Sequence, residues 1–216
     1  MKPLRLAALA VTVIALRVVP VQAQHPLHVT AGFEAASTHA RSRATGVAEL
    51  LSGVAFTGDA ALAIERWRLR LGYGQGNLDA DTGATAPRTL AEGRAQLGFA
   101  AASWLTWWAG PRARSYTTSG VRQRWWFWEI AAEMRGPLFA DRAYAFGSLG
   151  FAPAGTVDAV PAFSRATGVA AGLAVRLPSG TGTWARLGYR VDQTRLAGGR
   201  RETVEAISLG VTMELR

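Results

Sequence analysis

From residue 24 onward, apolar side chains alternate with small or polar ones along most of the chain. Residues two apart in a β-strand point to the same side, so the stretch "ERWRLRLGYG", residues 65–74, would have two unlike faces. One face holds Arg66, Arg68 and Arg70, and the other holds Trp67, Leu69, Leu71 and Tyr73. A soluble protein would turn the apolar face inward, whereas a membrane barrel would turn it toward lipid.

The alternation predicts an all-β fold of about ten strands. The predicted strands span 27–37, 46–57, 61–74, 88–100, 104–114, 122–135, 143–151, 166–176, 184–194 and 203–215. Most exceed the ~5–6 residues common in soluble sheets and match the ~9–11 residues that a tilted strand needs to cross a bilayer. No stretch after residue 24 approaches the ~18 consecutive apolar residues of a transmembrane helix.

The predicted connections alternate in length along the chain. Those at 57–60, 101–103, 135–142 and 177–183 are short or moderate, and those at 74–88, 113–123, 151–168 and 193–203 are longer. Short turns at one end and longer loops at the other are typical of outer-membrane barrels. An even number of strands and a periplasmic N-terminus would place every long loop outside the cell.

The N-terminal residues have the pattern of a secretory signal. Lys2 and Arg5 precede an apolar run at 6–16, and Val21-Gln22-Ala23 is typical of a cleavage site. We therefore expect a signal peptide over 1–23 and a barrel over 24–216, the alternative being an uncleaved N-terminal anchor. The absence of cysteine excludes a disulfide framework and a thiolate metal site.

The second faces of the predicted strands are small or charged, which suits a narrow lumen. In the last strand Ile207, Leu209, Val211, Met213 and Leu215 form the apolar face. With this pattern, residues 24–216 resemble the small bacterial outer-membrane β-barrel proteins. The resemblance implies a closed, antiparallel, up-and-down transmembrane barrel of about ten strands in the bacterial outer membrane. It also implies membrane lipid and the assembly machinery as partners, and a basic external surface would meet the anionic headgroups of lipopolysaccharide. Many such barrels end in an aromatic residue, whereas this chain ends in Arg216.

Charged residues on the second faces predict an ion cluster inside the lumen. If the 74–88 loop closes symmetrically, Arg70 lies opposite Glu92 and Arg68 opposite Arg94, and the next turn brings Arg112 beside Glu92. The predicted cluster comprises Arg66, Arg68, Arg70, Glu92, Arg94, Arg112, Glu129, Glu133, Arg186 and Arg190. Such a cluster either fills the lumen as a salt-bridge network or provides a polar path for solutes.

Tryptophan is abundant, at 8 residues, and aromatic girdles at membrane–water interfaces explain such clustering. The aromatics predicted to face lipid are Trp67, Tyr73, Trp107, Trp126, Trp128 and Tyr189, whereas Trp104, Trp108 and Trp125 fall on the opposite faces. Ordinary core packing and a carbohydrate platform are the alternatives.

The sequence offers little for catalysis. Omptin-type barrel proteases place acidic pairs and a histidine on external loops, and Asp79 and Asp81 fall in a predicted external loop. The only histidines, however, are His25, His28 and His39, and His39 falls in the first predicted loop. A lipid A deacylase barrel needs a histidine and a serine close together on one strand, and Ser208 has no such neighbour. We therefore expect no catalytic residues, cofactor or metal.

A sequence pI near 11.2 is also typical of nucleic-acid-binding proteins, but an export signal argues against that function. The sequence predicts a non-enzymatic outer-membrane barrel with a narrow, charged, largely side-chain-filled lumen and a structural, adhesive or small-solute passage role. One alternative is a barrel enzyme acting on lipid or peptide at the external face. Another is an exported, soluble, lipocalin-like binder of an apolar ligand.

Overall fold

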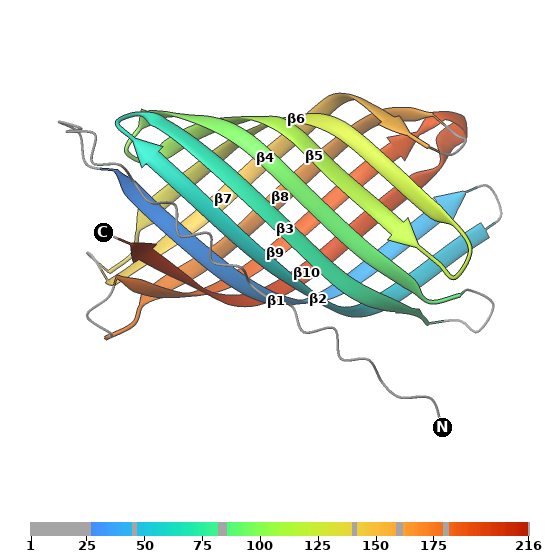
Figure 1. The fold of residues 1–216 in the computed structure, drawn as a ribbon, viewed down its shortest axis with the longest axis horizontal. Coiled ribbons are helices and arrows are strands. Elements are labelled where there is room, and N and C mark those ends of the chain that lie inside the picture. The colour runs from blue at the N-terminus through green and yellow to red at the C-terminus, as the bar shows by residue number, and fades with distance from the viewer. Residues whose placement is uncertain are drawn as a thin grey trace.

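A computed structural model describes residues 27–44, 47–81, 86–139, 142–158, 162–178 and 182–215. Ten long strands and one short 3-10 turn account for nearly all of them (Figure 1). The elements are β1 (His28–Ala44), β2 (Val47–Ile64), β3 (Trp67–Ala80), β4 (Arg88–Ala102), β5 (Leu105–Thr117), β6 (Arg122–Pro137), β7 (Ala143–Val157), β8 (Phe163–Arg176), β9 (Thr183–Leu196), η2 (Ala197–Gly199) and β10 (Arg201–Leu215). The all-β prediction is confirmed, and the signal peptide predicted over 1–23 lies outside the described residues.

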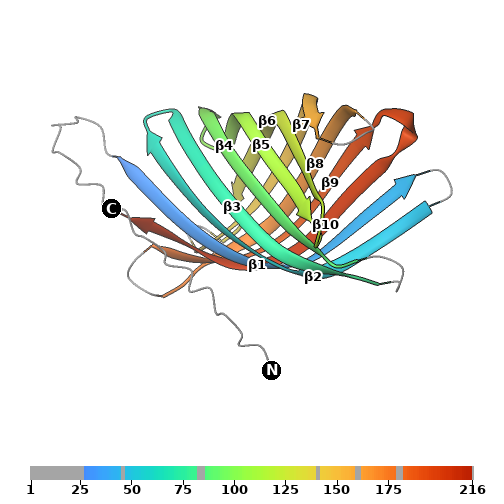
Figure 2. The same cartoon turned by 45° about the vertical axis from the view of Figure 1, so that its right-hand side comes forward.

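The strands form a closed barrel. Each strand pairs antiparallel with its neighbours in the sequence, and β1 pairs with β10 to close the sheet. A row of directly paired residues that starts at Val29 passes once around the barrel and returns to β1 at Arg41. This stagger accompanies the strong strand tilt visible in Figures 1 and 2. β1 begins and β10 ends at the same end of the barrel, here called the terminal end, and the opposite end is the distal end.

The outer face of the barrel is apolar over most of its height. In β3, Trp67, Leu69, Leu71 and Tyr73 point outward and are 41–59% exposed, whereas the neighbouring arginines point into the lumen. The apolar belt comprises the outward-facing residues of 29–35, 54–64, 67–73, 95–99, 107–113, 126–134, 145–151, 169–175, 185–191 and 207–215. No outward-facing position of this belt carries a charge, as the hydrocarbon region of a bilayer requires. The lipocalin-like interpretation is therefore wrong.

Most buried apolar side chains gather in the distal half of the lumen, whereas Trp108, Ala143 and Ala174 are buried nearer the terminal end. One cluster contains Ala40, Leu51, Leu78, Leu90, Tyr116 and Val204, and a second contains Trp125, Phe127, Ala152, Ala166 and Leu196. These residues lie near the distal ends of all ten strands. The barrel therefore has a packed core at one end of its lumen.

The strands are longer than predicted, and the prediction of long loops is wrong. Residues 57–60, predicted as a turn, lie within β2, and the turn falls at 65–66. Most residues of the predicted long loops also lie in strands. His39 lies in β1 and Asp79 in β3, so neither is a loop residue. Beyond the apolar belt the outer face of each strand meets water. Polar residues can therefore occupy both faces there, and the strand continues without the apolar alternation that predicts it.

Candidate functional site

Five charged residues meet near the middle of the lumen and form the central ion cluster: Glu92, Arg112, Arg114, Arg190 and Asp192. Arg114 lies 2.7 Å from Glu92 and 3.0 Å from Asp192, and Arg190 lies 2.6 Å from Glu92. Arg112 pairs with Glu92 at 3.3 Å and also with Asp192. β4 and β5 place Glu92 directly across from Arg114, whereas β9 approaches from another part of the wall, so the cluster spans the lumen.

A distal branch joins this cluster to the apolar core. Arg114 also pairs with Glu202 of β10 at 3.2 Å, and the Tyr116 hydroxyl donates a hydrogen bond of 2.9 Å to the same carboxylate. Arg114 is 2% exposed and Glu202 is 4% exposed. The ring of Tyr116 belongs to one of the apolar clusters, so one side chain links the charged and the apolar parts of the lumen.

A second branch runs toward the terminal end. Arg112 pairs with Glu129 at 3.2 Å, and the Gln96 amide donates a 3.0 Å hydrogen bond to Glu129. Arg70 donates to Gln96 at 2.7 Å and to Glu133 at 2.9 Å, and its guanidinium lies 4.2 Å from the centre of the Trp108 ring. Charge and hydrogen bonding therefore continue from β10 to β6 without a break.

The energetics of such a network depend on its completeness. Desolvation of a buried charge costs several kcal/mol, and the attraction between charges offsets this only when the geometry and the remaining hydrogen bonds are good. Asp192 is 5% exposed, yet it contacts three arginines. The network therefore specifies how the walls of the barrel face one another, and removal of one member leaves others charged and unpaired.

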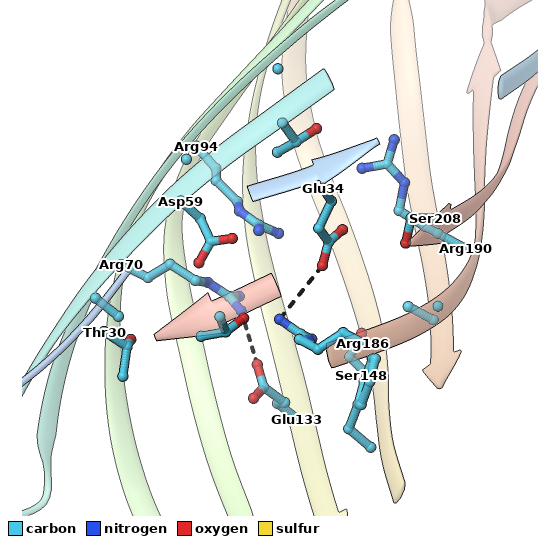
Figure 3. Close-up of a pocket in the computed structure, with 18 of the residues that line it drawn as sticks. Thr30, Glu34, Asp59, Arg70, Arg94, Glu133, Ser148, Arg186, Arg190 and Ser208 are labelled. Atoms are coloured by element: carbon cyan, nitrogen blue, oxygen red, sulfur yellow. Dashed lines mark hydrogen bonds and ion pairs between the residues drawn. The ribbon is translucent and has the colours of Figure 1, made fainter. Parts of the chain in front are cut away.

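A polar cavity of about 220 Å³ occupies the terminal half of the lumen (Figure 3). Ion pairs between Arg70 and Glu133 and, at 3.6 Å, between Arg186 and Glu34 cross its walls. Arg94 also points into the cavity, and among the described residues no direct ion pair or hydrogen bond to its guanidinium is found. The cavity is lined by both charge signs and by hydroxyls, and the central ion cluster limits it on the distal side.

The structure corrects the predicted pairing of β3 with β4. Arg70 lies opposite Gln96 rather than Glu92, and Arg68 lies opposite Gly98 rather than Arg94. The turn between the two strands is not centred where symmetric closure placed it, and every pair along the hairpin shifts with it. Glu92 is instead directly opposite Arg114.

One more predicted cluster residue lies elsewhere, and one residue of the network was not predicted. Arg66 lies in the 65–66 turn and is exposed, so it does not belong to the lumen. Arg135, which the prediction omitted, pairs with Glu133 at 2.7 Å.

The prediction also missed three residues of the central ion cluster and its distal branch: Arg114, Asp192 and Glu202. The alternation of the ninth strand already placed Asp192 on the same face as Arg186 and Arg190. Arg114 ended the predicted strand 104–114 and Glu202 fell in the predicted loop 193–203, where the alternation carried no information about partners. Only the closed register shows that β9 and β10 approach β5 across the lumen.

The aromatic side chains divide between the two faces. Trp67, Tyr73, Trp107, Trp126, Trp128 and Tyr189 point outward and are 48–65% exposed. Trp67 and Trp107 lie near the terminal end of their strands, and Tyr73 and Trp126 lie farther toward the distal end. Trp108 and Trp125 are buried in the lumen, and Trp104 is exposed in a turn.

The outer face carries one grouping of catalytic residue types. His39 in β1 lies directly opposite Ser52 of β2 and Glu205 of β10, and Ser37 shares its face two residues away. In the described part of the chain, no hydrogen bond joins His39 to these residues, and the Ser52 hydroxyl donates to Asp81 instead. Among the described residues, no three acids or histidines are arranged to hold a metal ion.

Within the described ranges, no helix is both long and apolar enough to cross a bilayer.

Comparison with solved structures identifies barrels of the same architecture. The outer membrane protease OmpT from Escherichia coli matches with a TM-score of 0.59 and 9% identity, over 89% of this chain and 97% of that chain. The translocator domain of the autotransporter NalP from Neisseria meningitidis matches with a TM-score of 0.51 and 14% identity, over 87% and 88%. No family model matches this chain, and no curated protein sequence matches it. One of the two structures is a protease and the other a translocator domain, so the likeness shows the fold alone.

The structure combines a closed antiparallel barrel, an apolar belt without charge on its outer face and a charged lumen. The chain therefore has the fold of the bacterial outer-membrane β-barrel proteins.

Proposed function

We propose that this protein is a non-enzymatic, structural barrel of the outer membrane whose lumen is closed to through passage. The observation that carries the proposal is the layering of the lumen. Apolar side chains fill the distal half, the central ion cluster spans the middle, and the cavity of about 220 Å³ lies on the terminal side of both. A ten-stranded barrel is also far below the 16–18 strands that leave an aqueous porin channel.

The lumen residues act as an internal brace in this proposal. Ion pairs between β5 and β9 and between β5 and β10 connect walls that share no backbone hydrogen bonds. The outward aromatics anchor the barrel at the two membrane interfaces, where an amphipathic ring meets both lipid and water. An adhesive role has less support, because the strands continue through most of the segments expected as long external loops.

Conductance in planar bilayers tests the closed lumen. Purified mature protein should insert without stable single-channel steps. The matched variant, Trp125→Ala with Phe127→Ala, removes two large side chains from the distal core and should show steps if the core is the seal. Stable steps from the unmodified protein would refute the proposal.

A second candidate is an enzyme acting on lipid esters at the outer face. The observation that favours it is the placement of His39 opposite Glu205 and next to two serines, because a nucleophile, a base and an acid are the parts of a hydrolytic triad. The proposed structural role predicts no release of fatty acid from a lipid ester in mixed micelles. Turnover that disappears in both His39→Ala and Ser37→Ala would favour the enzyme instead.

A further inference from the structure

Four arginines stand side by side on the outer face at the distal end. Arg165 of β8 is directly opposite Arg195 of β9, Arg195 is opposite Arg201 of β10, and Arg201 is opposite Arg43 of β1. These four residues are here called the arginine row. Each belongs to the same outward face as the apolar belt of its strand, because paired residues in a sheet share a face.

The positive charge of the row is not balanced within the protein. Like charges directly opposite one another destabilise a sheet, and none of the four guanidinium groups has an ion pair within the described residues. On the outer faces of these four strands the only acid is Glu205, four residues from Arg201. Arg195 lies beyond the apolar belt, and the positive charges of Arg165 and Arg201 lower its pKa. An external anion would relieve this repulsion.

The row lies close above the lipid-facing surface. One row nearer the membrane, Thr167, Gln193, Thr203 and Arg41 are paired in the same way. The apolar belt then begins at Val191 on β9, four residues from Arg195, which is about 13 Å along a tilted strand at ~3.3 Å per residue. Arginine side chains can extend along such a surface, so their guanidinium groups reach the headgroup layer.

We propose that the arginine row binds the phosphate groups of a phosphorylated glycolipid in the outer leaflet. A guanidinium offers paired N–H donors that match two phosphate oxygens, and several on adjacent strands can hold one or two phosphates. The acyl chains of the same lipid lie against Tyr189, Ile207 and Leu209 below the row. A soluble polyanion could use the charges but would gain nothing from this apolar surface. The inference goes beyond the structural role proposed above and adds a lipid ligand.

The mature protein in a non-ionic detergent provides the test, with diphosphorylated lipid A as the probe. Native mass spectrometry measures the bound lipid, and heat-modifiable migration reports whether the barrel is folded. The intact protein should retain lipid A and bind its dephosphorylated form at least tenfold more weakly, because a charge-assisted phosphate contact is worth about 1.5–3 kcal/mol and ~1.4 kcal/mol is tenfold. Equal binding of both forms would overturn the proposal.

A matched pair of double variants locates the site. Arg195→Gln with Arg201→Gln removes two charges from the row and should weaken lipid A binding about tenfold or more. Arg122→Gln with Arg124→Gln removes two exposed distal arginines of β6 that face Ser115 and Thr117 rather than arginines, and should weaken binding less than about threefold. Equal weakening in both would refute a specific row.

Two further arms complete the design. If the first double variant fails to fold, Arg43→Gln with Arg165→Gln tests the same row from its two outer members and should show the same loss. Inorganic phosphate at millimolar concentration should not displace lipid A, because it lacks the acyl chains. Full displacement would show a general anion site and would contradict a lipid ligand.

Discussion

The two halves of the lumen are closed by opposite kinds of chemistry. The distal half is filled by apolar side chains such as Leu78, Trp125 and Val204, which are essentially inaccessible to solvent. The terminal half is polar and keeps a cavity between its ion pairs. Apolar packing tolerates no solvent and gives stability through burial, whereas ion pairs give orientation but cost desolvation. The difference suggests that the distal half seals the barrel and the terminal half only braces it.

The largest loss of stability is expected at Arg114, where the two halves of the lumen meet. Arg114→Ala leaves Glu92, Asp192 and Glu202 without a shared cation in a nearly dry environment. The free energy of unfolding should fall by about 3–5 kcal/mol. Urea unfolding in lipid vesicles, followed by tryptophan fluorescence, measures the loss. Arg66→Ala, in the exposed turn, is the control and should change stability by less than about 0.5 kcal/mol. A loss below 1 kcal/mol for Arg114→Ala would show that the carboxylates find other partners.

A slightly smaller loss is expected in the distal core. Leu78 is 0% exposed, and Leu78→Ala removes buried methyl groups and leaves a void. The free energy of unfolding should fall by about 2–4 kcal/mol, depending on how far the neighbours relax. The same urea titration applies, with Leu71→Ala on the outer face as a size-matched control. If both leucines cost the same, the distal cluster is not a close-packed core.

Substitutions in the terminal half of the lumen should reduce stability less than those in the distal half. Glu133→Gln removes the ion pairs with Arg70 and Arg135 but keeps the side-chain shape. Arg135 is 56% exposed in its side chain and regains water, and Arg70 keeps its bond to Gln96. A loss of about 1–2 kcal/mol is therefore expected from the same measurement. A cost as large as that of Arg114→Ala would remove the distinction between seal and brace.

The sequence specifies the strands and their faces better than their ends and partners. Alternation in Trp67–Tyr73 identifies which side chains face lipid, because a bilayer admits no charge on that face. It does not show where β3 ends, since Gln75, Asn77 and Asp79 face water on one side and look like a loop. Nor does it give the register, which a shift in the centre of one turn alters along the whole hairpin. Predicting the central ion cluster requires that register and the closure of β1 on β10. The sequence therefore placed Asp192 on the lumen face but did not identify its partners.

The smallest effect is expected at Arg94, two residues from Glu92 on the same face of β4. Arg94 has a position in the lumen similar to that of Arg112, which lies directly opposite it on β5. The difference is that Arg112 contacts Glu92, Glu129 and Asp192, whereas Arg94 has no direct ion pair among the described residues. Arg94→Gln should therefore leave the free energy of unfolding within about 0.5 kcal/mol of the original value, or raise it, because an unpaired charge is removed from a partly buried site. Arg112→Gln is the matched comparison and should be clearly destabilising. If both variants lose stability equally, position in the lumen rather than pairing determines the contribution of an arginine.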